Sequence, residues 1–255
     1  MHLGWLIGVA LLLYGPAVAQ TPLVRVHHVE NEDGKVYIVA ENKGVAVVTV
    51  YLSAELVNMT SEPTLPTKFA LFPTQGPQIL ATLTHRIGVP FSYQYRAPAY
   101  LGLYSSRRSD TTQATYHFPF SPNTPWNWGL FDKRTGQPQF AIHSYVFALA
   151  DHTPVRAARA GVVANIRQDR KLNSSREANG IEVLHDDGTY ACYLNIASQS
   201  ARVGLGQRVN AGDQLAEYRD DKLHLPLWFF VQRLGEKGPE NIPAHFEKAS
   251  QMPPH

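Results

Sequence analysis

The sequence predicts a mostly β protein with two β-rich domains, and three observations support this prediction. Apolar and polar residues alternate with a period of two in the first half, as from Val48 to Leu56, and this period indicates half-buried strands. The 18 glycines and 18 prolines divide the chain into short segments, which is typical of turns between strands rather than of a helical bundle. A hydrophobic content of 44% and a charged content of 17% are those of a globular chain.

The first predicted domain spans residues 20–110 and contains several short strands. Asp33-Gly34 lies between two strand-like runs, which is a signal for a tight hairpin. Tyr93 and Tyr95 alternate with polar residues in a further strand. Short strands separated by turn signals at this spacing are typical of a β-sandwich. We therefore expect a small antiparallel sandwich of immunoglobulin-like type without a catalytic site.

Residues 1–19 are predicted to be a signal peptide. The apolar run from Leu3 to Leu13 is too short to span a bilayer, and an Ala-Val-Ala cleavage pattern precedes Gln20. The expected location is therefore the periplasm or the outside of the cell, with no transmembrane span after cleavage. A single cysteine, Cys192, excludes an intramolecular disulfide, and we expect this thiol to be buried in a strand.

The boundary between the domains is predicted at the polar segment 107–113, which has no apolar period. The second domain is expected over residues 115–235. A C-terminal tail is expected over 236–255, with a short helix at 244–250. The Pro- and aromatic-rich segment 118–129 either packs on a sheet or forms an exposed surface for carbohydrate or peptide, and packing is favoured because large aromatic side chains serve core burial.

Four segments of the second half carry recognisable motifs in a fixed order. They contain a Thr-Pro-Val turn followed by Gly-Val-Val, a strand followed by Asp-Gly-Thr-Tyr-Ala, a Val-x-Ala-Gly turn and a Phe-Phe-Val strand, at residues 147–163, 181–193, 203–215 and 229–231. Together they resemble the lysostaphin/LytM-type zinc metallopeptidases, a family of peptidoglycan endopeptidases with the duplicated-hybrid-motif fold. The resemblance covers residues 116–233 and implies a LytM-type antiparallel β-sheet domain.

The resemblance also implies a particular chemistry. In that family, a His and an Asp of an H-x-x-x-D motif and the second His of an H-x-H motif bind zinc, which leaves one position open for water. The zinc lowers the pKa of this water and polarises the scissile peptide carbonyl. Two further histidines serve as base and as hydrogen-bond donor to the transition state. The implied substrate is the peptide cross-bridge or stem of bacterial peptidoglycan.

This chain departs from the family pattern at each of those positions. Ile142 and Val146 stand at the two ligand positions of H-x-x-x-D, and neither side chain has a donor atom for zinc. Asn195 stands where a catalytic histidine belongs, and Pro226 and Trp228 stand at the two histidines of H-x-H. An indole offers only an N–H and no lone pair. We therefore expect a degenerate member of the family without zinc or another cofactor.

Nearby His and Asp side chains are the alternative ligands if zinc binds at a shifted position: His143, Asp151, His152, His185 and His224. The simpler interpretation is that these are surface or structural residues. A groove without metal would bind by shape, aromatic contact and hydrogen bonds. The candidate groove residues are His143, His152, Asn195 and Trp228.

The sequence is compatible with three functions. The first is a non-catalytic LytM-type protein that binds peptidoglycan or regulates a cell-wall hydrolase. The second is an active zinc metalloendopeptidase that cleaves peptidoglycan cross-links with relocated ligands. The third is a periplasmic partner-binding or structural protein. A nucleic-acid partner is not expected, because the net charge is only +2 and the basic residues are not clustered.

Overall fold

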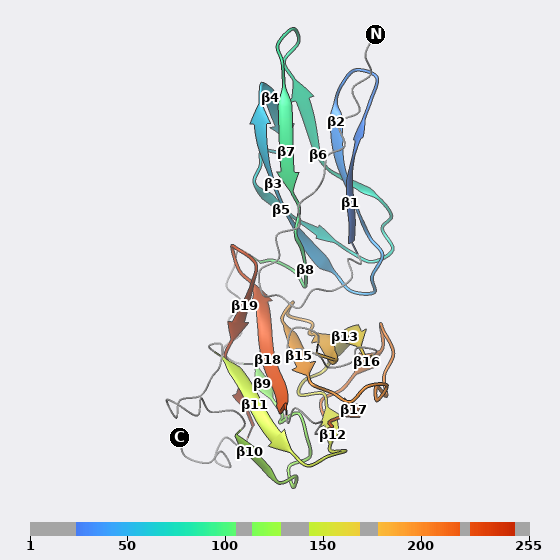
Figure 1. Cartoon of the computed structure of the whole chain (residues 1–255), viewed down its shortest axis with the longest axis vertical. Helices are drawn as coiled ribbons and strands as arrows, with labels where there is room; N and C mark the ends of the chain where they lie inside the picture. The colour runs from blue at the N-terminus through green and yellow to red at the C-terminus, as the bar shows by residue number, and fades with distance from the viewer. Residues whose placement is uncertain (1–23, 106–113, 129–142, 169–177, 220–224, 248–255) are drawn as a thin grey trace. The chain divides into compact units, whose positions relative to one another are not determined.

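The computed structural model describes five stretches of the chain: residues 24–105, 114–128, 143–168, 178–219 and 225–247. The predicted signal peptide, the predicted boundary segment, Ile142 and His224 lie outside them. The chain divides into two compact units, Met1–Tyr100 and Leu101–His255 (Figure 1). Over the described stretches the regular structure consists of strands, without a helix. The prediction of a mostly β protein is confirmed.

Two antiparallel sheets form the first unit. One sheet has the strand order β1-β2-β6-β4, and the other has the order β5-β3-β7 with β8 also paired to β3. The strands are β1 (Val24–Glu30), β2 (Val36–Asn42), β3 (Val48–Val57), β4 (Met59–Glu62), β5 (Thr67–Leu71), β6 (Gln78–His85), β7 (Ser92–Arg96) and β8 (Ala99–Leu101). An immunoglobulin-like arrangement of these strands stays a prediction.

The predicted alternation in the first unit places one face of each sheet in a shared core. Val36, Ile38 and Ala40 of β2 are fully buried, and they pack with Val50 and other apolar residues of β3. The hairpin expected at Asp33-Gly34 joins β1 to β2. Gly34 has a φ of 74° there, which a residue with a side chain rarely adopts.

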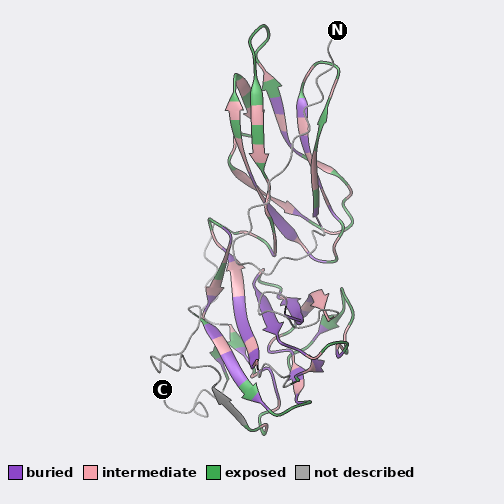
Figure 2. Ribbon diagram, in the orientation of Figure 1, coloured by how far each residue is buried: buried purple, intermediate pink, exposed green. Residues whose placement is uncertain are grey.

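An antiparallel sheet of eight strands is the centre of the second unit. Its order is β10-β11-β18-β15-β14-β13-β16, and β19 pairs with β18. The strands of this sheet are β10 (Trp126–Trp128), β11 (Ser144–Leu149), β13 (Gly161–Arg167), β14 (Gly180–Leu184), β15 (Tyr190–Leu194), β16 (Arg208–Val209), β18 (Leu227–Leu234) and β19 (Pro239–Ile242). Figure 2 shows the middle strands of this sheet mostly in the colour of buried residues. The expected antiparallel β-sheet domain is confirmed.

Two short strand pairs complete the second unit. They are formed by β12 (Pro154–Arg156) with β17 (Gln214–Glu217), and by β9 (Thr115–Tyr116) with β20 (His245–Phe246). The β9–β20 pair is parallel.

Residues 239–247 belong to this unit, where the sequence led us to expect a tail and a helix. Strand β20 stands at the start of the expected helix over 244–250. Ile242, Ala244 and Phe246 are buried, so buried and more exposed residues alternate here as they do in a strand. Three alternating apolar residues were too few for the sequence to predict this strand.

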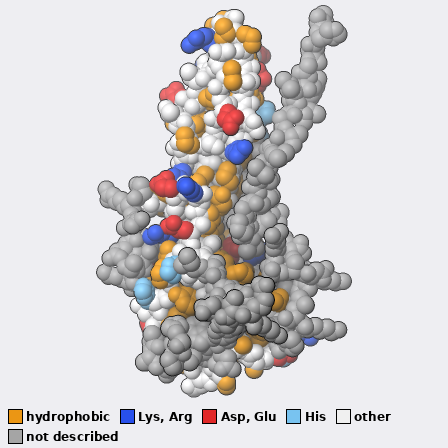
Figure 3. Space-filling model, turned by 60° about the vertical axis from the view of Figure 1, so that its left-hand side comes forward, with side chains coloured by type: hydrophobic (Ala, Val, Ile, Leu, Met, Phe, Trp, Pro, Cys, Tyr) orange, Lys and Arg blue, Asp and Glu red, His pale blue; other side chains and the backbone are white. Residues whose placement is uncertain are grey.

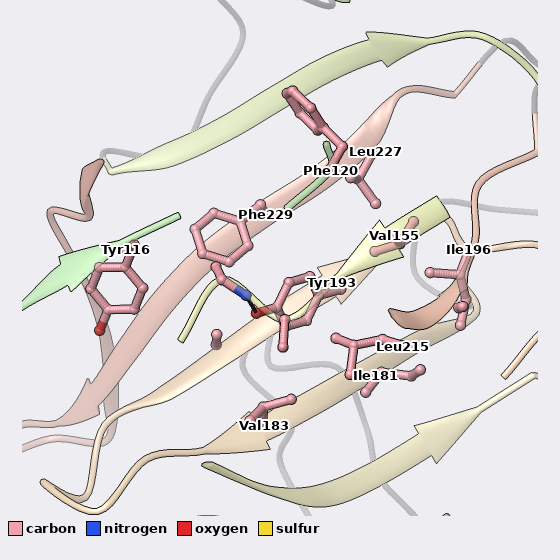
Figure 4. Packing of buried hydrophobic residues seen from close by; sticks show 14 of the residues in the cluster. Tyr116, Phe120, Val155, Ile181, Val183, Tyr193, Ile196, Leu215, Leu227 and Phe229 are labelled. Carbon is pink, nitrogen blue, oxygen red and sulfur yellow. Dashed lines mark hydrogen bonds between the residues drawn. The ribbon is translucent and has the colours of Figure 1, made fainter. Parts of the chain in front are cut away.

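The inner face of the large sheet covers an aromatic core. Tyr193 and Phe229 are both fully buried on adjacent strands, and their ring centroids are 5.2 Å apart. The hydroxyl of Tyr193 accepts a hydrogen bond of 2.7 Å from the backbone N–H of Ala158 (Figure 4). Phe118 and Phe120 also pack against this core, which is the packing expected for this part of the aromatic segment. Cys192 is buried in β15, as predicted.

Candidate functional site

Val146 and Trp228, which the sequence resemblance aligns with two ligand positions, are direct neighbours across two strands. Val146 on β11 pairs with Trp228 on β18, and Trp228 pairs with Leu194 on β15. The adjacent residues Phe229 and Tyr193 belong to the inner core. Because side chains alternate along a strand, Val146, Trp228 and Leu194 share the opposite face, which we call the outer face of the sheet.

The outer face continues over the neighbouring strands in two parallel rows. The first row joins Val146, Trp228, Leu194, Gly180 and Arg167, and the second joins Ser144, Phe230, Cys192, Glu182 and Asn165. Most of these side chains are buried, and Arg167 pairs with Glu182 at 3.5 Å. The outer face is therefore apolar around Trp228 and polar at the side of β13.

Asn195 and Pro226, which the sequence resemblance aligns with two catalytic positions, are joined by a hydrogen bond. The side-chain Nδ2 of Asn195 donates to the carbonyl oxygen of Pro226 at 2.7 Å. The backbone N–H of Asn195 donates to the carbonyl oxygen of Asn179, and the residue is buried with a φ of 67°. Asparagine tolerates this left-handed conformation better than most residues. Its amide therefore ties the end of β15 to the start of β18.

Removing this bond is expected to destabilise the second unit. We predict that Asn195→Gly, which keeps the left-handed backbone accessible, lowers the free energy of unfolding by about 1–3 kcal/mol because the carbonyl of Pro226 loses its donor. Denaturant unfolding measures the change. Asn210→Ala at an exposed position is the control and is expected to change stability by less than about 0.5 kcal/mol. Equal effects of the two substitutions would contradict this role of Asn195.

The two histidines of the candidate groove lie at opposite ends of β11. His143 is exposed in the turn before this strand, and His152 lies in the turn after it. Six residues of extended strand separate them, which corresponds to about 20 Å. His152 contacts Asp151 at 3.6 Å and Glu217 at 3.5 Å. The structure therefore brings Val146, Asn195, Pro226 and Trp228 together, but it does not bring both histidines to them.

His185 has a structural environment. It is 2% exposed, and its Nδ1 lies 2.8 Å from the carbonyl oxygen of Ala160. Its ring meets that of Tyr116 edge-on, with 5.7 Å between the centroids. Burial, together with the nearby Arg159 cation, lowers the pKa of His185 to about 4. Next to it, Arg159 donates to Asp187 at 2.6 Å and fixes the β14–β15 turn.

The described residues do not fit the zinc ion that the resemblance implies. Val146 has no donor atom, and the indole of Trp228 has no available lone pair. Over the described stretches, no group of three or more His, Cys, Asp or Glu side chains is placed to hold a metal ion. Among the described residues, Val146 and Trp228 therefore offer zinc no ligand atom.

The surface of the described chain gives two further facts. In the view of Figure 3, acidic and basic side chains are interspersed over the first unit, in keeping with the small net charge. Within the described residues, no helix has the length and hydropathy needed to cross a membrane.

Comparison with known proteins finds a family model and solved structures that are similar to the second unit. The model of peptidase family M23 matches residues 142–229, whereas no curated protein matches the chain. The catalytic domain of lysostaphin from Staphylococcus simulans aligns with a TM-score of 0.33 and 18% identity over 47% of this chain and 89% of its own. The catalytic domain of the M23 protein EnpA from Enterococcus faecalis aligns with a TM-score of 0.35 and 21% identity over 49% of this chain and 94% of its own. A zinc containing peptidase from Vibrio cholerae aligns with a TM-score of 0.34 and 12% identity over 85% of this chain and 83% of its own. The motifs quoted above and the match to the family model agree, and residues 142–229 of the second unit are similar to peptidase family M23.

Proposed function

We propose that this protein is an exported, non-catalytic member of its family that binds the peptide part of peptidoglycan. The observation that carries the proposal is the Val146–Trp228 pair. These two residues are cross-strand neighbours, so a metal at the family's position would face a valine and an indole. The fold that presents a wall peptide to a metal is kept, while the donors that would hold the metal are replaced.

The catalytic positions support the same proposal. Asn195 has no basic group near neutral pH, and its amide serves a structural hydrogen bond to Pro226. Proline at position 226 offers no side-chain donor or acceptor. Neither residue can therefore supply the proton transfer that the family's histidines supply.

A relocated zinc site is less well supported. His185 is buried, and its Nδ1 already faces the carbonyl oxygen of Ala160. His152 is paired with two carboxylates at the far end of β11 from His143. These histidines lie on separate parts of the unit and do not form one ligand set. We therefore favour binding over hydrolysis.

The proposal is tested by exposing insoluble peptidoglycan to the protein that begins at Gln20. We expect the protein to co-sediment with the wall, to release no new peptide detectable by mass spectrometry, and to behave identically with and without a chelator. Peptidoglycan stripped of its peptide stems by an amidase is the control and should retain much less protein. Chelator-sensitive release of peptides would establish a peptidase, and failure to co-sediment would reject wall binding.

A further inference from the structure

Two neighbouring loops at one end of the first unit carry apolar residues. One loop, residues 86–91, joins β6 to β7, and the other is the turn at Asn58 between β3 and β4. The loops lie together because Val57, at the end of β3, pairs with Ser92 at the start of β7. Figure 1 shows the β6–β7 loop projecting beyond the ends of β3 and β4. We call Val57 and residues 87–91 the apolar tip.

The large side chains of the apolar tip are exposed to solvent. The exposed fractions are 91% for Ile87, 55% for Val57, 40% for Phe91 and 37% for Val89. Figure 3 shows apolar side chains gathered at this end of the first unit, beside a basic side chain. Exposed Arg86 directly precedes the apolar run. A contiguous group of exposed apolar side chains marks an interaction site, whereas single ones need no explanation.

Several polar groups of the tip are already satisfied within the protein. Nδ2 of Asn58 donates to the carbonyl oxygen of Pro90 at 2.7 Å, and the carbonyl oxygen of Asn58 accepts from the backbone N–H of Arg86 at 2.9 Å. Pro90 itself has no backbone N–H. Backbone groups that are paired in this way lose no hydrogen bond when the loop leaves water. The tip therefore enters an apolar environment at a lower cost than an ordinary loop would.

The size and the shape of the tip favour a lipid bilayer over a protein partner. A stable protein interface buries about 800 Å² on each side and takes roughly 20–30 residues of each partner. The apolar tip has six residues and projects from the unit, so a protein partner would need a matching pocket and much additional surface. A bilayer needs neither. An arginine such as Arg86 suits this surface, because its stem covers apolar groups while its cation stays among the lipid headgroups.

The charges near the tip are balanced. The loop of the β1–β2 hairpin lies beside it, since its backbone contacts the ring of His85. The cations of Lys35 and Arg86 are offset there by two acidic residues, Glu32 and Asp33. Attraction to anionic lipid therefore adds little, and burial of apolar surface is the driving force.

We propose that the apolar tip inserts into the interfacial layer of a lipid bilayer, with Ile87 as its deepest residue and Arg86 among the headgroups. One small apolar tip gives weak, reversible binding, comparable with that of a single acyl chain. This inference goes beyond the proposed function and does not depend on it, because the tip belongs to the first unit and the wall-binding proposal rests on residues of the second.

The experiment measures flotation of the protein that begins at Gln20 with phosphatidylcholine vesicles. We expect half-maximal binding between about 0.1 and 1 mM lipid, with little change on addition of phosphatidylglycerol or salt. Ile87→Ser should weaken binding about tenfold or more, because the buried apolar side chain is lost. The matched control is Ile79→Ser, on the same strand β6 but outside the tip and 61% exposed, which should leave binding unchanged. Neither substitution should move the unfolding midpoint, since both side chains are exposed.

An environment-sensitive dye reports insertion directly. It is attached to the protein with Ile87→Cys or, as the control, Ile79→Cys, while Cys192 is buried and stays unlabelled. Vesicles should shift the emission to the blue only for the dye at position 87. Absence of vesicle binding, equal weakening by the two serine variants or an unshifted emission at position 87 overturns the inference.

Sedimentation without lipid tests a second copy of the chain as the occupant of the tip. We expect no self-association through the tip. A dimer that Ile87→Ser dissociates would assign the tip to a protein interface and would also overturn the inference. Each of these results leaves the proposed function standing, because binding to peptidoglycan is measured separately by co-sedimentation with the wall.

Discussion

Phe229→Ala is expected to lower the free energy of unfolding of the second unit by about 3–5 kcal/mol. Phe229 is fully buried on the inner face of β18. Its ring centroid lies 5.2 Å from that of Tyr193 and 5.8 Å from that of Phe246. Alanine at this position would leave a cavity between three strands that the surrounding rings cannot fill. Denaturant unfolding followed by fluorescence measures the loss.

The control for this prediction is Phe72→Ala in the first unit. Phe72 is 46% exposed, so truncating it should cost far less than truncating Phe229. Similar losses in the two variants would show that Phe229 is not at the centre of the core. The result matters for function because Phe229 directly follows Trp228 and fixes the strand that presents it.

Acidification from pH 7 to pH 4 is expected to lower the free energy of unfolding of the second unit by about 3 kcal/mol through His185 alone. The pKa of His185 is about 4 in the folded protein against an ordinary value of 6.5, because the buried ring is costly to protonate. Between these two values the unfolded chain binds more protons than the folded chain. Stability is therefore complete above pH 6.5 and is lost as the pH falls towards 4.

The variant that isolates this effect is His185→Gln. Glutamine retains a donor for the carbonyl of Ala160 but does not titrate, so the pH dependence between 6.5 and 4 should become shallower. A dependence at and below about pH 4 should persist in both proteins, because hydrogen bonds from Thr189 and Arg159 hold the pKa of Asp187 below its usual value of 3.8, and protonating that carboxylate costs stability. Identical pH profiles of the protein and the variant would contradict the buried neutral state of His185.

Much of the fold follows from local patterns in the sequence. The period of two from Val48 to Leu56 predicted β3, and Asp33-Gly34 predicted the turn between β1 and β2. These features depend on neighbouring residues only. Strand β20 was missed because its pairing partner, β9, lies more than a hundred residues earlier in the chain, and such a pairing leaves no local signal.

The candidate site could be predicted only in part for the same reason. Motif spacing pointed to Val146 and Trp228, and the sheet register makes them neighbours. The hydrogen bond from Asn195 to Pro226 depends on how distant strands align. The sequence showed the donor chemistry of Asn195 but not its partner.

The most direct test of the central claim is the zinc content of the protein purified from Gln20 onward without chelators. The account predicts no stoichiometric zinc after dialysis, because Val146 and Trp228, which the resemblance aligns with two ligand positions, pair across β11 and β18 and offer no lone pair to a metal. Elemental analysis by mass spectrometry gives the metal-to-protein ratio. About one tightly held zinc per chain would contradict the account, since a structural or catalytic zinc requires a ligand set that the described residues do not provide.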